Sequence, residues 1–95
     1  MHGLMMEYPL TIQAILDRAE RMYGHKRIIS QLTDKSRHEY TYADLGQRVR
    51  TLASALAKLG VQAGDRVATL CWNHYWHVEA YFAIPAMGGV LHTLN

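Results

Sequence analysis

The chain has 95 residues, of which 49% are hydrophobic and 19% are charged. This composition is typical of globular proteins and excludes a disordered, collagen-like or disulfide-rich chain. The formal net charge of +2, with basic residues scattered along the chain, gives no support for binding to nucleic acid or to an anionic membrane. Cys71 is the single cysteine, so no internal disulfide can form and a reducing cytoplasm is the expected location.

The start of the chain, MHGLMMEYPL, does not have the pattern of a secretory signal peptide. It has no basic segment ahead of an apolar run, and Glu7 and Pro9 interrupt its apolar character. No segment reaches the roughly 18 consecutive apolar residues that a membrane-spanning helix requires. We therefore expect neither a cleaved signal peptide nor a transmembrane segment.

A first amphipathic helix is predicted between Thr11 and Gly24. Thr11 is a suitable N-cap, and Gly24 is placed to end the helix. The apolar residues at helical spacing are Ile12, Ile15, Leu16, Ala19, Met22 and Tyr23. After the helix, residues 27–32 are rich in β-forming side chains, residues 33–36 supply turn chemistry, and residues 37–40 form a second, more polar run. This order predicts a β-hairpin.

A second helix is predicted to begin at Thr41, whose side chain can cap the first turn while Asp44 completes a capping box. Gly46 weakens this turn by about 1 kcal/mol relative to alanine. The apolar stripe of the helix consists of Leu45, Val49, Leu52, Leu56 and Leu59, and Gly60 closes the helix. The basic residues on its other side are Arg48, Arg50 and Lys58. We interpret them as a solvated face, with a phosphate or nucleic-acid contact as the alternative.

The last third of the chain predicts a strand, a helix and a second strand. Residues 63–65 form a turn, and residues 66–71 form a short apolar strand. The following helix covers residues 75–87, with Asn73 as its cap and His77 and Glu79 as its only strongly polar members. A helix that is apolar nearly all round is typical of burial on several sides.

The end of this helix is marked by Pro85, which predicts a kink or an early stop. Gly88 and Gly89 then turn the chain into a last strand, residues 90–94. A strand, helix and strand in this span form a βαβ unit, whose strands belong to a parallel sheet covered on both faces. The fold class is therefore α/β, with an incomplete sheet.

Cys71, His74 and His77 are spaced three residues apart and are of the types that bind zinc. A structural zinc site needs four ligands, and no fourth candidate lies nearby. We therefore interpret them as a buried cysteine and two histidines on a helix face. Between the predicted strand and helix lie Trp72, Asn73 and His74, a position where ligands bind in open α/β sheets. We interpret Trp72 as a packed aromatic and Asn73 as a helix cap, with the lining of a ligand channel as the alternative.

Signatures of phosphate binding and of catalysis are missing from the sequence. Gly88 and Gly89 precede a strand, whereas phosphate-binding glycine loops lead into a helix. Ser30, Ser36 and Ser54 have no local sign of activation. We interpret His92, in the last strand, as a side chain that a further part of the polypeptide would cover. No catalytic, cofactor-binding or metal-binding residue is assigned.

Three segments carry a family resemblance: TYADL at residues 41–45, QRVRTLASALAKLGVQAGDRVATL at residues 47–70, and AMGGVLHTLN at residues 86–95. They resemble the first core motifs and the spacing of the AMP-forming adenylating enzymes, a superfamily that includes acyl-CoA synthetases. The resemblance covers nearly the whole chain. Residues 1–24 and 72–95 are most similar to bacterial medium- and long-chain fatty-acid CoA ligases.

The resemblance implies that residues 1–95 are the truncated N-terminal portion of the large, layered α/β domain of an acyl-CoA synthetase. It implies a full-length enzyme that uses ATP, Mg²⁺ and coenzyme A to convert a fatty acid into its acyl-CoA through an acyl-adenylate. The chemical residues of the family fall after Asn95, so we expect this span to be inactive alone and to bind none of these cofactors. The resemblance also implies a possible homodimer to which the helix at residues 11–23 contributes, with a surface helix packed on its own domain as the favoured interpretation.

Two hypotheses follow. The first is the N-terminal fragment of a fatty-acid CoA ligase. The second is a free-standing small α/β interaction or binding module without catalysis. Binding of a hydrophobic dye and the lack of a cooperative thermal transition would favour the first.

Overall fold

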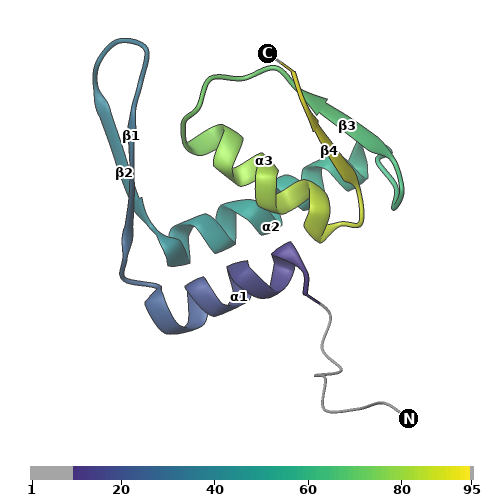
Figure 1. Cartoon of the computed structure of the whole chain (residues 1–95), viewed down its shortest axis with the longest axis horizontal. Coiled ribbons are helices and arrows are strands. Elements are labelled where there is room, and N and C mark those ends of the chain that lie inside the picture. The colour runs from purple at the N-terminus through teal and green to yellow at the C-terminus, as the bar shows by residue number, and fades with distance from the viewer. Residues whose placement is uncertain (1–9, 95) are drawn as a thin grey trace.

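The computed structural model describes residues 10–94 of the chain. The expectations for the first residues, including Glu7 and Pro9, lie outside the described part. The elements are α1 (Ile12–Tyr23), β1 (Arg27–Gln31), β2 (Arg37–Thr41), α2 (Tyr42–Lys58), β3 (Arg66–Thr69), α3 (Tyr75–Ala86) and β4 (Val90–Thr93). In Figure 1, α1 and α2 run side by side, the hairpin of β1 and β2 rises at one end, and β3 and β4 lie at the other end. Within residues 10–94, no helix combines the length and apolar character that crossing a membrane requires.

The predicted bounds of α1 are confirmed, and the Thr11 hydroxyl accepts a hydrogen bond from the Ala14 N–H at 3.2 Å. Leu16 is the buried residue of this helix, whereas Ile15 is 59% exposed. The apolar stripe is therefore only partly covered. Gly24 follows the helix in a right-handed conformation, and a Cβ there would lie 2.8 Å from the carbonyl oxygen of Glu20. Close backbone approach, rather than a left-handed turn, thus requires glycine at this position.

The hairpin is confirmed as an antiparallel pair in which Arg27 lies opposite Thr41 and Gln31 opposite Arg37. Ser30 and Tyr40 are the buried residues of its two strands. Both face the helices because alternate side chains of a strand point to the same side.

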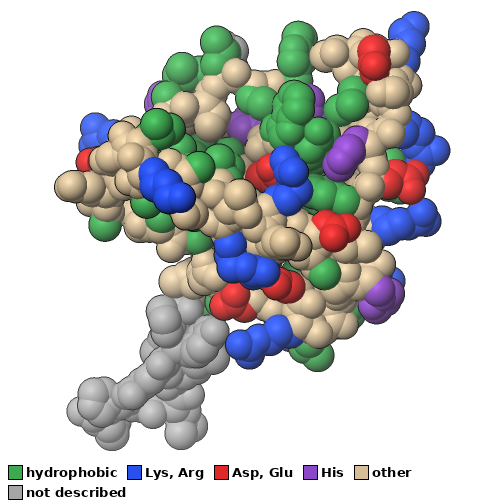
Figure 2. Space-filling model, turned by 180° about the vertical axis from the view of Figure 1, so that it is seen from behind, with side chains coloured by type: hydrophobic (Ala, Val, Ile, Leu, Met, Phe, Trp, Pro, Cys, Tyr) green, Lys and Arg blue, Asp and Glu red, His purple; other side chains and the backbone are tan. Residues whose placement is uncertain are grey.

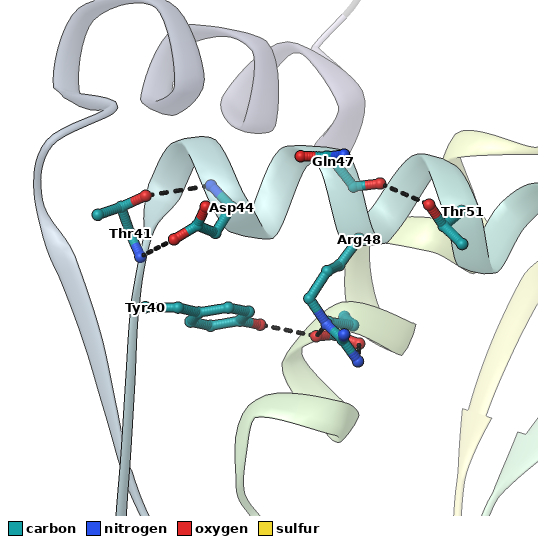
Figure 3. A network of polar contacts seen from close by, with 7 residues as sticks. Tyr40, Thr41, Asp44, Gln47, Arg48 and Thr51 are labelled. Atoms are coloured by element: carbon teal, nitrogen blue, oxygen red, sulfur yellow. Dashed lines mark hydrogen bonds and ion pairs between the residues drawn. The ribbon is translucent and has the colours of Figure 1, made fainter.

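The start of α2 carries the predicted capping box (Figure 3). The Thr41 hydroxyl accepts from the Asp44 N–H, and the Asp44 carboxylate accepts from the Thr41 N–H, both at 3.1 Å. Leu45 and Val49 are buried as predicted, but Leu59 is 82% exposed, so its assignment to the apolar stripe was wrong. Leu59 is the C-cap, where the helix has already ended and its stripe no longer faces the core.

Gly46 lies where α1 and α2 approach each other. A Cβ at this position would fall on the carboxylate of Glu20, so the glycine leaves room for a charged side chain of the neighbouring helix. The loss of helix propensity at Gly46 therefore has a packing reason that the local sequence does not reveal.

The βαβ unit is confirmed: β3 and β4 pair in parallel, with Val67 opposite Leu91. Three local predictions were wrong. The strand ends at Thr69 rather than at residue 71, and the N-cap of α3 is His74 rather than Asn73. No side chain caps this helix. The helix also continues through Pro85 to Ala86, because a proline in the last turn removes only one backbone hydrogen bond.

The hydrophobic core lies between the three helices and the hairpin. Its buried members are Leu16, Tyr40, Leu45, Val49 and Ala83. Because α3 contacts α1, α2 and both strands of the parallel pair, its nearly uniform apolar surface meets neighbours on several sides, as predicted.

Candidate functional site

The most buried charge among the described residues is Glu79, in the middle of α3. Its side chain is 5% exposed. The guanidinium of Arg48, on α2, donates to both oxygens of this carboxylate, through Nε and, at 3.4 Å, through Nη2. The hydroxyl of Tyr40, on β2, donates to the same carboxylate at 2.9 Å. Figure 3 shows the Tyr40 and Arg48 side chains directed from different elements towards one point.

The electrostatics of this network follow from burial and from the shared carboxylate. Burial raises the pKa of the Tyr40 phenol, and the hydrogen bond to Glu79 raises it further. The hydrogen bond with Glu79 also raises the pKa of Arg48. An aromatic layer adjoins the network, with the rings of His38 and Tyr75 stacked 3.7 Å apart. The Arg48 guanidinium lies 5.8 Å from the centre of the Tyr75 ring.

The network joins β2, α2 and α3, and both oxygens of its carboxylate accept hydrogen bonds from protein donors. Glu79 and Arg48 line a groove between α2, β3 and α3, but both oxygens of the Glu79 carboxylate already accept hydrogen bonds from Arg48 or Tyr40, which disfavours a role as general acid or base. We therefore assign the network to structure. The network is not predictable from the basic residues of α2, because the charge pattern indicates only a solvated face for Arg48. The signal that could have revealed it is an acidic residue inside an apolar helix, since such a residue requires a partner.

The other two basic residues of α2, Arg50 and Lys58, differ in their contacts. Arg50 donates to Glu20 of α1 at 2.9 Å, which raises the pKa of Arg50, and Lys58 is exposed. All three basic residues are exposed, as the solvated-face interpretation predicts, and Arg48 and Arg50 also pair with carboxylates of neighbouring helices. Two of the three basic side chains connect α2 to other helices.

A groove of about 760 Å³ lies between α2, β3 and α3. Its lining is mainly apolar and includes Leu52, Leu56, Val67, Trp76 and Ile84. In Figure 2, which views the molecule from behind Figure 1, hydrophobic side chains gather in the upper middle of the face, and charged side chains lie below them and along the edges.

A second cavity, of about 440 Å³, lies at the carboxyl ends of β3 and β4. Trp72, Asn73 and His77 are on its wall, whereas His74 is not. Trp72 is 74% exposed, so its interpretation as a packed aromatic was wrong. Cys71 is also exposed, which corrects its assignment as a buried cysteine. Both errors arise because the strand ends at Thr69 and the following residues form a surface loop.

His77 of α3 and the N-cap of this helix, His74, are buried. His77 Nε2 lies 2.9 Å from the Thr69 hydroxyl, and its ring stacks on Tyr81 at 4.5 Å. Within residues 10–94, no group of three or more His, Cys, Asp or Glu side chains is arranged to hold a metal ion. Cys71, His74 and His77 are therefore not brought together. His92 is exposed on β4.

The serines and glycines of the described chain do not form a phosphate-binding loop. Ser30 is buried in β1, and Ser54 is exposed. The Ser36 hydroxyl and, to a smaller extent, the Ser36 N–H donate to the Asp34 carboxylate and lower its pKa. The glycines with positive φ are Gly60, Gly64 and Gly88. Each precedes a turn or a strand, and none lies at the start of a helix.

This α/β arrangement, with its hairpin, capped helix and parallel βαβ unit, is that of an adenylating enzyme, and the chain belongs to the AMP-binding enzyme family, whose model matches residues 16–95. It is 50% identical over 91 residues to a long-chain-fatty-acid–CoA ligase of Thermus thermophilus, covering 96% of this chain and 17% of that protein. It is 37% identical over 95 residues to a medium-chain-fatty-acid–CoA ligase of Ectopseudomonas oleovorans, covering all of this chain and 17% of that protein.

Solved structures agree with the fold. The anthranilate CoA ligase AuaEII superposes with a TM-score of 0.76 at 25% identity, covering 93% of this chain and 17% of that chain. A fatty acyl CoA synthetase of Mycobacterium tuberculosis superposes with a TM-score of 0.74 at 22% identity, covering 90% and 16%. The predicted fold class is thus confirmed. The chain spans about one sixth of the length of these relatives.

Proposed function

We propose that residues 1–95 form the scaffolding first part of the large domain of an AMP-forming fatty-acid CoA ligase. The observation that carries this proposal is the 50% identity over 91 residues to a ligase of long-chain fatty acids. The network of Glu79, Arg48 and Tyr40 supports a scaffolding role, because its hydrogen bonds join β2, α2 and α3.

In the proposed reaction, a fatty carboxylate attacks the α-phosphate of ATP and releases pyrophosphate. The thiol of coenzyme A then attacks the acyl carbon and releases AMP. Residues 10–94 offer neither a glycine loop at a helix start nor a cluster of metal-binding side chains. We therefore place the groups that bind ATP, Mg²⁺ and coenzyme A elsewhere in the enzyme and derive no catalytic step from the described residues.

Two further parts of the proposal concern the whole enzyme. We propose a homodimer that uses α1, because Ile12, Ile15 and Met22 are 43%, 59% and 60% exposed on this helix. We also propose that the enzyme is cytoplasmic, which agrees with a single, exposed, unpaired cysteine. Sedimentation of a full-length enzyme carrying Ile15→Lys tests the first of these, and a monomer is the expected result.

A chimera tests the ligase proposal. The matching 91 residues of this chain replace their counterpart in the Thermus thermophilus ligase, and fatty-acid-dependent ATP–pyrophosphate exchange and acyl-CoA formation are measured. We expect activity within about tenfold of the parent ligase, a loss below 1.4 kcal/mol in transition-state stabilisation. The 95-residue chain alone should catalyse no exchange.

The parent ligase is the matched control. A chimera that folds with the parent's thermal stability but activates no fatty acid would contradict the proposal. Exchange catalysed by the 95-residue chain alone would show that catalytic residues lie within this span.

A further inference from the structure

A cavity of about 420 Å³ lies between β1 and the first two turns of α3. Figure 1 shows α3 beginning on the side that faces the hairpin. The polar part of the cavity wall includes Ser30 of β1 together with His74 and His77, and its apolar part includes Ile28 and Val78. Among the described residues, no Asp, Glu, Lys or Arg side chain lines this cavity. A ligand here would therefore meet hydrogen-bonding groups and apolar surface rather than a charged side chain.

Two imidazoles of this wall each have an unsatisfied polar atom. His74 is 9% exposed and His77 is 4% exposed, and the Nδ1 atom of each is buried without a hydrogen-bond partner among the described residues. Neighbouring rings hold both imidazoles in place, because His77 stacks on Tyr81 at 4.5 Å and His74 lies edge-on to Trp76 at 4.9 Å. A buried polar atom without a partner destabilises the fold, so the two nitrogens indicate a ligand that satisfies them.

The surroundings of His77 and the start of α3 favour an anion as this ligand. The Nε2 atom of His77 lies 2.9 Å from the Thr69 hydroxyl. A neutral imidazole carries one N–H, so when this hydroxyl donates to Nε2, Nδ1 carries the proton and is a donor. No side chain caps α3, and the first N–H groups of a helix have no partner within it. The N-terminus of a helix also attracts negative charge.

We propose that this cavity binds a small monocarboxylate, in addition to the fatty acid that the enzyme activates in the proposed reaction. The carboxylate accepts hydrogen bonds from Nδ1 of His74 and of His77, and a short apolar tail lies against Ile28 and Val78. The apolar wall favours this ligand over inorganic phosphate, which has no apolar part. The lack of Lys and Arg in the wall also favours a single negative charge over the higher charge of a phosphate.

Hydrogen exchange in the chimera, read by mass spectrometry, tests the site with butanoate as the probe. The measurement is made with and without an excess of a stable acyl-adenylate analogue, which fills the acyl site of the ligase. In both cases, millimolar butanoate should slow the exchange of the amides at residues 74–78 by about tenfold. Butanamide, which has the same tail and no charge, should leave this exchange unchanged.

A pair of substitutions in the chimera locates the binding. His77→Phe keeps an aromatic ring beside Tyr81 but removes the ring nitrogens, so the butanoate concentration that gives half of the full protection should rise about tenfold or more. His92→Phe is the matched control, because His92 is exposed on β4 and does not line the cavity. This control should be protected at the original butanoate concentration.

Lack of protection by butanoate overturns the proposal, and so does equal protection by butanamide or by inorganic phosphate. Protection that His77→Phe leaves unchanged, or that occurs only without the analogue, also overturns it and assigns the butanoate to another site. If His77→Phe does not fold, the comparison of butanoate with butanamide and phosphate in the unsubstituted chimera decides the question. None of these readouts depends on catalysis, so a chimera that activates no fatty acid but shows the protection would refute the proposed function alone.

Discussion

Arg48 and Glu79 form an ion pair whose two partners differ in exposure: the Arg48 side chain is 50% exposed, and the Glu79 side chain is 5% exposed. The two residues are 31 positions apart and connect α2 to α3. Removing Arg48 and removing Glu79 should therefore lower the free energy of unfolding by different amounts. Only the Arg48 charge can be rehydrated when its partner is removed.

We expect Arg48→Met to lower the free energy of unfolding by about 3 kcal/mol, because it leaves a buried carboxylate without its cation. Glu79→Gln should cost about 1 to 2 kcal/mol, because the freed guanidinium reaches water. Urea unfolding of the chimera, carrying each substitution in turn, measures both. The double variant Arg48→Met/Glu79→Leu should recover part of the loss, and a larger cost for Glu79→Gln than for Arg48→Met would contradict this account.

Because of the Tyr40 phenol, the free energy of unfolding should decrease at alkaline pH. Its pKa is raised in the folded chain, so the folded state keeps a proton that the unfolded state loses. The stabilisation is complete below the unfolded pKa of about 10 and decreases as the pH rises above it. Unfolding measured from pH 9 to 11.5 should show this decrease, and Tyr40→Phe should reduce it. An unchanged slope in that variant would show that other groups are responsible.

The capping box at the start of α2 gives a prediction with an internal control. Thr41→Ala removes a hydroxyl that accepts from the Asp44 N–H, and should cost about 1 kcal/mol. Thr51→Ala, in the same helix, removes only a bond from its hydroxyl to the Gln47 carbonyl and improves helix propensity, so it should be neutral or slightly stabilising. Thermal unfolding of the two variants compares them directly, and equal costs would argue against the cap.

Cys71 should react rapidly with a soluble thiol reagent under native conditions, because it is exposed in the loop after β3. The rate should change less than about tenfold on addition of urea. Slow labelling that accelerates only on unfolding would place this cysteine in the interior, as the sequence pattern alone had indicated.

The order and type of the elements were predictable because they depend on local signals. Thr11 and Thr41 mark two helix starts through hydrogen bonds to residues three positions away. The βαβ unit followed from apolar runs separated by Gly88 and Gly89. The start of α3 could not be predicted in this way, since His74 caps it without any side-chain bond and leaves no chemical signature.

The sequence by itself determined the helices, the hairpin, the parallel unit and the resemblance to adenylating enzymes, since short-range periodicity and motif spacing are properties of the chain. Only the tertiary structure decided that Arg48 and Tyr40 meet at Glu79, that Gly46 makes room for Glu20, and that Ala68 lines an open groove. The physical reason is that a contact between distant residues depends on how whole elements cross. Local periodicity places a side chain on a face of its helix or strand and does not identify what lies opposite.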